Sequence, residues 1–472
     1  MGDKVSDHLQ IAILGGGAGA FAAAIRTNEL KEKTALINAG LPIGGTCVNV
    51  GCVPSKTLLY AGEILHHAKH HGILGIELEI KSFDFRKVIQ DELALVERLR
   101  HEKYEKVLKN LEHVTLIEGK AKFVSKNEIE VNGKKFNAEK FIIATGSTAN
   151  VPPIDGIHEV GFITHIEALR LEKQPKELII VGAGSVGLEF AQMYARFGAK
   201  ITVLELGGSI FPHSEEALTD RLAETLAREG IVIKTNVAVT SARRENRKKV
   251  LSYRVNETQQ EVSADEILLA AGKTPNTQGL GLDKTGVTLD KRQAVVVNPF
   301  FQTSNQNIFA VGDVTNAPLR LETTAGREGT LAAENAIKGA RLSIDYNTVP
   351  YAIFTDPQLA GVGFTEEEQM KKMGVCACRT VSFADVPKAI IMRRTEGLIK
   401  MAIHPQTREI LGIHILAPNA SELVAQAMVL IKNRNTIDDV VNSLPMFPTL
   451  SEAIKIVALS FTKDISKLSC CI

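Results

Sequence analysis

The sequence predicts an α/β protein with two dinucleotide-binding units and a third unit of mixed α+β character. Two glycine-rich motifs, each preceded by a short apolar strand and followed by a helix, predict the first two units. The length of 472 residues exceeds that of one ordinary domain, so two or three domains are expected. Beyond residue 346, strands of alternating polarity precede two helices, and this change of pattern predicts the third unit.

The first glycine-rich motif follows a short apolar strand near the N-terminus. Gly15, Gly17 and Ala20 occupy the three small-residue positions of a dinucleotide-binding turn. The pyrophosphate of the nucleotide would then lie at the N-terminus of the following helix. The next strand, residues 34–37, ends in Asn38, where an acid usually holds the ribose. An amide can still hydrogen-bond a hydroxyl group, without charge.

The same pattern recurs in the middle of the chain. Gly182, Gly184 and Gly187 follow a second apolar strand and open a second helix. The strand after this helix ends at Glu205, a carboxylate that fits a ribose hydroxyl. The interval from the first glycine to the end of the next strand is 23 positions in both units. Equal spacing predicts two nucleotide-binding units of one design.

Two cysteines five positions apart, Cys47 and Cys52, lie just after a glycine pair that includes Gly45. Glycine permits a close approach of the backbone to a flat partner. The segment from Cys47 onward is expected to start a helix, and a helix N-terminus together with nearby Lys56 favours a thiolate. The pattern predicts a redox-active or soft-metal-binding dithiol. The alternative, one half of a structural zinc site, lacks a second pair at zinc spacing.

These residues resemble the redox helix of the flavoprotein pyridine nucleotide-disulfide oxidoreductases. The resemblance implies FAD in the first glycine-rich unit, NADPH or NADH in the second, and a homodimer with shared active sites. It divides the chain into a first FAD-binding part at 1–150, an NAD(P)H-binding domain at 151–275, a second FAD-binding part at 276–345 and a dimerisation domain at 346–472.

The resemblance also implies which further residues contact the cofactors. Asp313 ends a strand in a Gly-Asp pair that binds the ribityl chain of the flavin in the family. Lys56 and Glu189 match a pair that flanks the flavin. The carboxylate of Glu205 would repel a 2′-phosphate and therefore favours NADH. Besides the glycine-motif positions, the implied cofactor contacts are Asn38, Gly45, Thr46, Lys56, Thr145, Gly146, Glu189, Glu205, Gly272 and Asp313.

One position departs from the disulfide-reducing members of the family. Their dimerisation domain carries a His-Pro-x-x-x-Glu motif whose histidine is the general acid and base for the dithiol. Here Phe447 stands in place of the histidine, while Glu452 remains. A phenyl ring cannot carry a proton, so the chain is not expected to reduce an organic disulfide in the usual way.

The chain ends in two adjacent cysteines, Cys470 and Cys471, which suit capture of a soft metal ion. Together with the missing histidine, this pair resembles the mercuric reductase branch of the family. The resemblance implies that Hg(II), arriving as thiol complexes, passes from Cys470 and Cys471 of the partner subunit to Cys47 and Cys52. In that scheme Cys52 lies nearer the flavin, Cys47 is more accessible, and Tyr104 lies near the metal.

Two alternatives stay open. A flavoprotein disulfide reductase of the thioredoxin reductase or lipoamide dehydrogenase type can also carry a redox-active dithiol, although it is expected to keep the histidine. A non-enzymatic flavoprotein that binds a soft metal would show no metal-dependent oxidation of the cofactor.

Composition gives no sign of several classes of binding partner. The formal net charge of +1 gives no reason to expect nucleic acid or an acidic membrane surface as a partner. The sequence has no apolar run of about 18 residues, so no membrane span is expected. Six cysteines in a chain of this length do not make a secreted disulfide scaffold, and a reducing cytoplasm is the expected compartment.

Two further clusters have a less definite meaning. The pairs His66/His70 and His67/His71 have helical spacing and could chelate a metal, but a solvated helix face is the favoured interpretation. Cys376 and Cys378 lie beside a predicted strand and would point to the same face. They are expected to be ordinary small residues.

Overall fold

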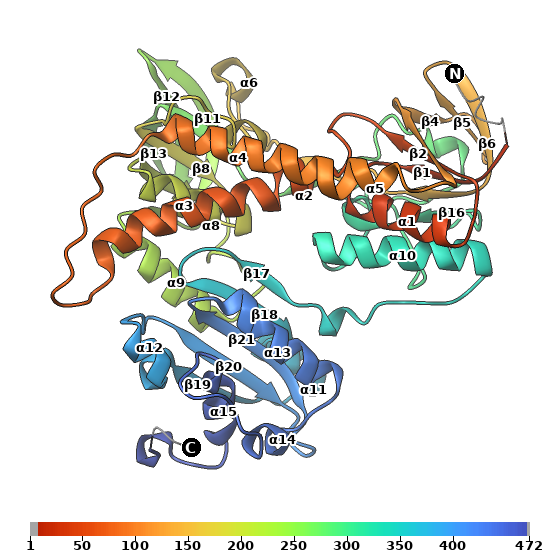
Figure 1. Cartoon of the computed structure of the whole chain (residues 1–472). Helices are drawn as coiled ribbons and strands as arrows, with labels where there is room; N and C mark the ends of the chain where they lie inside the picture. Colours follow the sequence, from red (N-terminus) through yellow and green to blue (C-terminus); the bar gives the residue numbers. More distant parts are fainter. Residues whose placement is uncertain (1–7, 470–472) are drawn as a thin grey trace. The chain divides into compact units, whose positions relative to one another are not determined.

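The computed structural model of the chain describes residues 8–469 (Figure 1). Its contacts group these residues into two compact units. Helix α3 (Cys52–His70) begins in the first unit and continues in the second. The first unit comprises Met1–Ser55, Ile89–Asn150 and Gly272–Tyr346, and the second comprises Lys56–Val88, Val151–Ala271 and Asn347–Ile472.

The first unit is built around a seven-stranded sheet. Strands β3, β2, β1, β6 and β16 are parallel, as a strand–glycine loop–helix repeat requires. Strand β5 pairs antiparallel with β6, and β4 pairs antiparallel with β5. The strands are β1 (His8–Leu14), β2 (Thr34–Asn38), β3 (Val114–Glu118), β4 (Ala121–Phe123), β5 (Glu128–Val131), β6 (Lys134–Ile143) and β16 (Ile308–Ala310).

Apolar side chains cover both faces of this sheet. Ile11 and Ile13 of β1 pack with helices α1 (Ala18–Glu29) and α10 (Glu322–Lys338), whereas Ala12 and Leu14 belong to the core on the other face. Helices α1 and α10 pack against each other, and an added Cβ at Gly329 would lie 2.0 Å from the carbonyl oxygen of Gly19. Glycine therefore sets the separation of the two helices.

The second unit repeats the same order of elements. Strands β10, β9, β8 and β14 form a parallel sheet, and helix α8 follows β8 directly after the second glycine-rich loop. A separate three-stranded antiparallel sheet, β11-β12-β13, is inserted along the chain between β10 and β14. The elements are α6 (Ile157–Val160), α7 (His165–Ala168), β8 (Glu177–Val181), α8 (Ser185–Arg196), β9 (Lys200–Leu204), α9 (Glu216–Arg228), β10 (Val232–Lys234), β11 (Ala238–Glu245), β12 (Lys248–Val255), β13 (Thr258–Ala264) and β14 (Glu266–Leu269).

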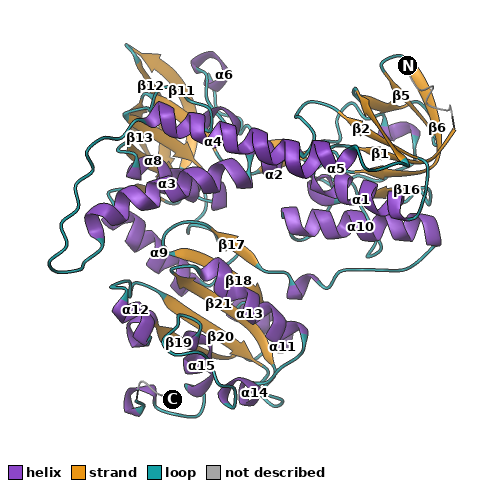
Figure 2. Cartoon of the chain, in the orientation of Figure 1, coloured by secondary structure: helices purple, strands orange, loops and turns teal. Residues whose placement is uncertain are grey.

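The C-terminal part of the second unit is a five-stranded antiparallel sheet with helices packed on it, as Figure 2 shows. The strand order is β17-β18-β21-β20-β19, so β19 is an edge strand. The elements are β17 (Tyr351–Ile353), β18 (Gln358–Gly363), α11 (Glu366–Met373), β19 (Ala377–Ser382), α12 (Pro387–Ile391), β20 (Leu398–Ile403), β21 (Ile410–Ala417), α13 (Ala420–Lys432), α14 (Ile437–Val441) and α15 (Glu452–Leu459). The predicted fold class, two α/β nucleotide-binding units followed by an α+β unit, is confirmed.

Two helical stretches are interrupted. The helix expected from Cys47 consists of α2 (Gly45–Val50) and α3, separated at Gly51, where an added Cβ would lie 2.9 Å from the carbonyl oxygen of Thr46. A second long helical stretch, residues 85–108, consists of α4 (Phe85–Arg100), a π-helical turn η1 (His101–Glu105) and α5 (Lys106–Leu108). The remaining elements are β7 (Ser147–Ala149), β15 (Lys273–Pro275) and the 3-10 turns η2 (Leu282–Lys284), η3 (Gly312–Val314), η4 (Tyr346–Thr348), η5 (Phe383–Asp385) and η6 (Ile465–Lys467).

Within residues 8–469, no helix combines the length and the apolar character that crossing a bilayer requires.

Candidate functional site

Glycine shapes the segment that carries the first dithiol, residues 42–52, which is called the dithiol loop below. It includes the turn before α2, α2 itself and the first residue of α3. Gly44 and Gly45 have φ values of 98° and 62°, which favour glycine. The amide N–H of Gly44 donates to the carbonyl oxygen of Gly16 over 2.8 Å, and an added Cβ at Gly45 would lie 2.4 Å from the Cα of Gly17. The dithiol loop therefore packs backbone to backbone against the first dinucleotide-binding loop.

A buried asparagine between the two cysteines fixes this loop. The amide nitrogen Nδ2 of Asn49 lies 3.0, 3.3 and 2.8 Å from the carbonyl oxygens of Pro42, Ile43 and Gly45. Arg100 of α4 donates to its Oδ1 over 3.2 Å. Asn49 was not predicted as a site residue, although an asparagine between two valines, Val48 and Val50, was a signal. These bonds tie the turn before α2 to the helix itself.

Neither Cys47 nor Cys52 is in a disulfide, and in the single chain Cys47 is half-buried and Cys52 is exposed. A hydrogen bond with Cys52 raises the pKa of Cys47, and burial and the neighbouring Glu322 raise it further. Two close thiols cannot both ionise readily, so this arrangement disfavours the thiolate expected at Cys47.

Tyr104 lies in the π-helical turn beside the dithiol loop. Its ring packs edge-on to Phe21 with centroids 4.9 Å apart, and an added Cβ at Gly44 would lie 3.1 Å from the ring. Burial raises the pKa of Tyr104 to about 12, and nearby Cys47 and Glu322 contribute. The phenol therefore keeps its proton at neutral pH. Glu322, the first residue of α10, is a second residue that the sequence analysis missed.

The first glycine-rich loop fits the diphosphate of a dinucleotide. An added Cβ at Gly15, where φ is 131°, would lie 2.2 Å from the carbonyl oxygen of Ala144. Gly17 is the N-cap of α1, and among the described residues no side chain caps that N-terminus. The Cβ position at Gly17 has no neighbour closer than 3.8 Å in the described chain, so an anion can approach the helix N–H groups. Ala20 is fully buried, as close packing of helix and strand requires.

Asn38 is not the only polar group at the ribose position of the first unit. Its Nδ2 lies 3.1 Å from the carbonyl oxygen of Leu41 and 3.1 Å from a carboxylate oxygen of Glu118. Glu118 ends β3 and is exposed. The carboxylate of Glu118 on β3 therefore lies beside Asn38, the position at the end of β2 where an acid was expected. This long-range pair has no local sequence signal.

The other residues predicted to contact the flavin lie near one another in the first unit. The hydroxyl of Ser147 donates to Asp313 Oδ2 over 2.7 Å. Thr145 Oγ1 donates to the carbonyl oxygen of Asn276 over 2.8 Å, and the Asn276 amide donates back to the Thr145 carbonyl oxygen over 2.9 Å. Gly146 has a φ of 69°. The antiparallel pair of β7 and β15 joins these segments.

The second glycine-rich loop has the same build. An added Cβ at Gly182 would lie 2.5 Å from the carbonyl oxygen of Ala270, and one at Gly187 would lie 1.9 Å from that of Gly182. Gly184 caps α8, and its Cβ position is open among residues 8–469. Gly272, with a φ of 90°, follows β14.

Glu205 is turned back onto this loop. Its carboxylate accepts from the amide N–H of Ala183 over 2.6 Å and from that of Gly207 over 2.7 Å. A carboxylate held in this way lies beside the glycine-rich turn, as a ribose-binding acid does in this fold.

Lys56 and Glu189, which match a flavin-flanking pair of the family, form an ion pair. Lys56 Nζ lies 2.7 Å from Glu189 Oε2 and 4.6 Å from the ring centre of Phe354. Glu189 is buried, and its other carboxylate oxygen accepts from the amide N–H of Phe354 over 2.9 Å.

The region of the missing histidine lies at the surface of the second unit. Phe447 is 46% exposed. The buried carboxylate of Glu452 accepts from the amide N–H of Thr449 over 3.0 Å. Cys470 and Cys471 lie outside the described residues. Among the predicted site residues, Thr46 is exposed on α2.

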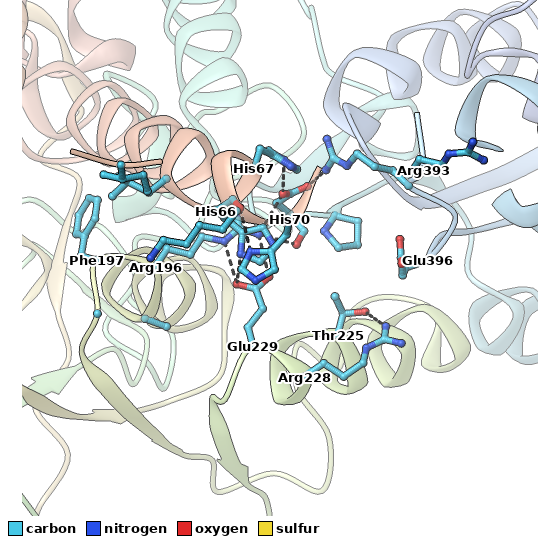
Figure 3. Close-up of a pocket in the computed structure, with 18 of the residues that line it drawn as sticks. His66, His67, His70, Arg196, Phe197, Thr225, Arg228, Glu229, Arg393 and Glu396 are labelled. Atoms are coloured by element: carbon cyan, nitrogen blue, oxygen red, sulfur yellow. Dashed lines mark hydrogen bonds and ion pairs between the residues drawn. The ribbon is translucent and has the colours of Figure 1, made fainter. Parts of the chain in front are cut away.

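The histidines of α3 form a solvated face only in part, because His70 is exposed while His66 and His67 are not. His66 and His67 are half-buried and line a cavity of about 680 Å³, where Figure 3 shows His66 close to Glu229. His67 Nε2 lies 3.1 Å from Asp356 Oδ2. Arg196 joins the two acids, at 2.8 Å from Glu229 and 3.0 Å from Asp356.

Charge in this cavity is therefore largely compensated. His66 and His70 stack with ring centres 4.4 Å apart, so their nitrogen atoms are not arranged to chelate one ion. Burial, followed by nearby Arg196, lowers the pKa of His66 to about 4, and the ring is neutral at pH 7. The network links α3 to α8 and to the end of α9 within the second unit.

Cys376 and Cys378 form a disulfide. The expectation that they are ordinary small residues is wrong, although their common face was predicted. The residue spacing allowed this pairing, because alternate side chains of an extended segment point the same way.

Comparison with known proteins agrees with this arrangement. A family model described as pyridine nucleotide-disulphide oxidoreductase matches residues 9–338, and the dimerisation domain of that family matches residues 349–458. The second match supports a homodimer. A mercuric reductase from Lysinibacillus sphaericus is 36% identical over 465 residues, which cover 98% of this chain and 85% of that protein.

Two other similar proteins extend the comparison. A mercuric reductase from Streptomyces lividans is 36% identical over 468 residues, covering 98% of each chain. The solved Cu(II) complex of the HOCl-induced flavoprotein disulfide reductase RclA from Escherichia coli superposes with a TM-score of 0.86 at 27% identity. That alignment covers 97% of this chain and 100% of the other.

Proposed function

The chain belongs to the pyridine nucleotide-disulphide oxidoreductase family, and from this premise we propose that it reduces Hg(II) to Hg(0) with electrons from NAD(P)H. The observation that carries the proposal is the pair Cys47 and Cys52, neither of them in a disulfide, in a chain whose general-base position holds Phe447. A dithiol without a proton-carrying partner suits a soft metal ion better than an organic disulfide.

The residues of the first unit fit FAD. Gly15, Gly17 and the N-terminus of α1 would hold the pyrophosphate, Asn38 with Glu118 the ribose, and Asp313 the ribityl chain. When bound, FAD supplies two-electron transfer between a nicotinamide and the dithiol site.

Cys47 and Cys52 hold the Hg(II) substrate between their two sulfur atoms. Each thiol gives up a proton as its Hg–S bond forms. Because its pKa is raised, Cys47 keeps its proton until the metal displaces it. The protonated phenol of Tyr104 can then donate to a neighbouring thiolate. Hg(0) has no affinity for thiolate and leaves once it has accepted two electrons.

Delivery of the substrate is assigned to the adjacent thiols at the C-terminus. Hg(II) bound by Cys470 and Cys471 of the partner subunit would exchange onto Cys47 and Cys52, with one Hg–S bond broken for each one formed. The same chemistry accepts Hg(II) from small-molecule thiol complexes in a reducing cytoplasm.

The second unit would bind the nicotinamide cofactor. Gly182, Gly184 and the N-terminus of α8 receive the pyrophosphate, and Glu205 receives the ribose. A carboxylate disfavours a 2′-phosphate, so NADH is the proposed donor. The pair of Lys56 and buried Glu189 is given a supporting role beside the flavin site.

Cu(II) is a second candidate substrate. The superposable Escherichia coli flavoprotein was solved as a Cu(II) complex, and a dithiol also binds copper. Reduction of Cu(II) at the same two cysteines would use the same electron donor.

The test is oxidation of NADH and of NADPH by the FAD-loaded protein with Hg(II) in excess glutathione. Hg(II)-dependent oxidation, lost in Cys47→Ala and impaired in the double variant Cys470→Ala/Cys471→Ala, is the expected result. Parallel assays use Cu(II), thioredoxin and lipoamide. Turnover with a disulfide substrate and none with either metal would overturn the proposal.

A further inference from the structure

We propose that Cys376 and Cys378, once reduced, form a second binding site for a thiophilic divalent metal ion such as Hg(II). This site is independent of the dithiol at Cys47 and Cys52, and it does not depend on electron transfer. The two residues lie at the start of β19, in the C-terminal part of the second unit.

The backbone already brings the two sulfur atoms together. Cys376 precedes the edge strand β19 and Cys378 lies within it, with 5.8 Å between their Cα atoms. Their disulfide shows that both side chains reach one point on the same face. β19 pairs with β20 and ends the described sheet, and both cysteines are only partly buried. A metal–thiol complex can therefore reach the pair without opening the core.

A third donor faces the two sulfurs. A carboxylate oxygen of Glu366, the first residue of α11, and the two Sγ atoms lie within 4.8 Å of one another. Lys400 Nζ lies 2.5 Å from Glu366 and 2.6 Å from Glu215. This shared lysine holds the Glu366 side chain in place. Gln369 Oε1 also lies 3.6 Å from Cys378 Sγ. Two soft sulfur donors and one oxygen donor favour a thiophilic ion over a hard cation.

The oxidation state of the pair controls binding. As a disulfide, the two sulfurs have no thiolate to offer. Two small-molecule thiols reduce the disulfide to two cysteine thiols and leave as one small-molecule disulfide. Hg(II) held by two such thiols then exchanges onto Cys376 and Cys378. Two Hg–S bonds break, two form, two small-molecule thiols leave with the cysteine protons, and mercury stays in the +2 state.

The experiment isolates this pair in the full-length chain. Cys47, Cys52, Cys470 and Cys471 are all changed to serine, so that the pair at 376 and 378 supplies the remaining thiols. The protein is reduced with dithiothreitol, separated from it without air, and mixed with HgCl₂ in excess glutathione. Mercury retained per chain after desalting is measured, together with the ultraviolet absorbance of mercury thiolates. Far-ultraviolet circular dichroism checks the fold of each variant.

The expected result is one mercury per reduced chain and almost none in the air-oxidised chain. Adding Cys376→Ser is expected to weaken binding about 100-fold, because a single thiol loses the chelate effect. Glu366→Gln is expected to weaken Cd(II) binding about tenfold and Hg(II) binding less than threefold, because Hg(II) accepts two sulfur ligands alone.

Two results would overturn the proposal. One is equal mercury retention with and without the Cys376→Ser change in a folded protein. The other is a disulfide that millimolar glutathione fails to reduce while the chain stays folded, since the pair would then be a structural link. Because these measurements use no NAD(P)H, they are independent of whether the enzyme reduces Hg(II).

Discussion

The molecule carries two cysteine pairs, and a different local backbone conformation sets the chemistry of each. Cys47 and Cys52 are separate thiols in a loop that packs on a dinucleotide-binding turn. Cys376 and Cys378 are two residues apart at the start of an edge strand, and a disulfide joins them. In the first pair, glycine and a buried asparagine hold the loop in its shape. In the second pair, the pleat of an extended segment alone brings the sulfurs together.

The difference separates two kinds of site. A loop fixed on a cofactor-binding turn suits turnover, because its thiols are held in one place relative to that turn. A pair on an accessible strand suits binding, because exchange with external thiols needs no movement of the core. Four changes test this distinction, and they are given in order of decreasing expected effect.

The largest effect is expected at Cys47. Changing Cys47 to serine removes one of two ligands for the substrate at the proposed reaction site, and Hg(II)-dependent NAD(P)H oxidation should fall at least about 100-fold. Cys376→Ser should cause a loss at least tenfold smaller. Initial rates at saturating NADH, normalised to bound FAD, measure both. Equal losses in the two variants would remove the distinction between the pairs.

The next effect is expected from the backbone of the dithiol loop. Gly45→Ala places a Cβ at 2.4 Å from Gly17 with a φ of 62°, so it should destabilise the folded loop by about 2–4 kcal/mol. Gly40 is the matched control, because its φ is 84° and its Cβ position has no neighbour within 4 Å in residues 8–469. Gly40→Ala should cost about 1 kcal/mol.

Thermal unfolding and retention of FAD after dilution measure the two glycine variants. The Gly45→Ala protein should lose FAD more readily than the Gly40→Ala protein. If both variants retain FAD equally, the packing of one loop on the other does not shape the flavin site.

A smaller effect is expected for Asn49. Alanine at this position removes the side-chain donor to the carbonyl oxygens of Ile43 and Gly45, at a cost of about 1–3 kcal/mol. Asn110→Ala changes an exposed asparagine and is the control. Chemical denaturation followed by flavin fluorescence compares them. A difference below about 0.5 kcal/mol would show that the loop keeps its shape without this side chain.

The smallest expected effect is on the number of protons released when Hg(II) binds. Because the pKa of Cys47 is raised, this thiol is protonated at pH 7 and must release its proton when Hg(II) binds. The apparent affinity should therefore rise with pH, by about tenfold per pH unit for one released proton. Mixing the reduced protein with HgCl₂ in weak buffer and a pH indicator counts the protons. Cys47→Ser should release one proton fewer, and an unchanged count would contradict the raised pKa.

Much of the fold was predictable because its signals are local. Each glycine-rich motif has a strand before it and a helix after it, so the order of elements around Gly15 and Gly182 could be derived from residue spacing. The dithiol was predictable for the same reason. The break at Gly51 was not, because it depends on a contact with the carbonyl oxygen of Thr46.

The remaining features depend on residues far apart in the chain. The carboxylate of Glu118 reaches Asn38 across 80 positions, and Asp356 meets His67 from a distant loop. The raised pKa of Cys47 arises from burial and from Cys52, whereas the sequence showed only a helix start and a lysine. Spacing alone gave Cys376 and Cys378 a common face but could not show that they pair.

The most direct test of the proposed reaction is the amount of Hg(0) released for each NAD(P)H oxidised. Hg(II) accepts two electrons and each NAD(P)H donates two, so the account predicts a ratio of one in the unchanged protein and no Hg(0) from Cys47→Ser. Hg(0) purged from solution is measured by atomic absorption while the absorbance of the nicotinamide is followed. Steady NAD(P)H oxidation without Hg(0), or undiminished Hg(0) release from Cys47→Ser, would contradict the assignment of Hg(II) reduction to this dithiol.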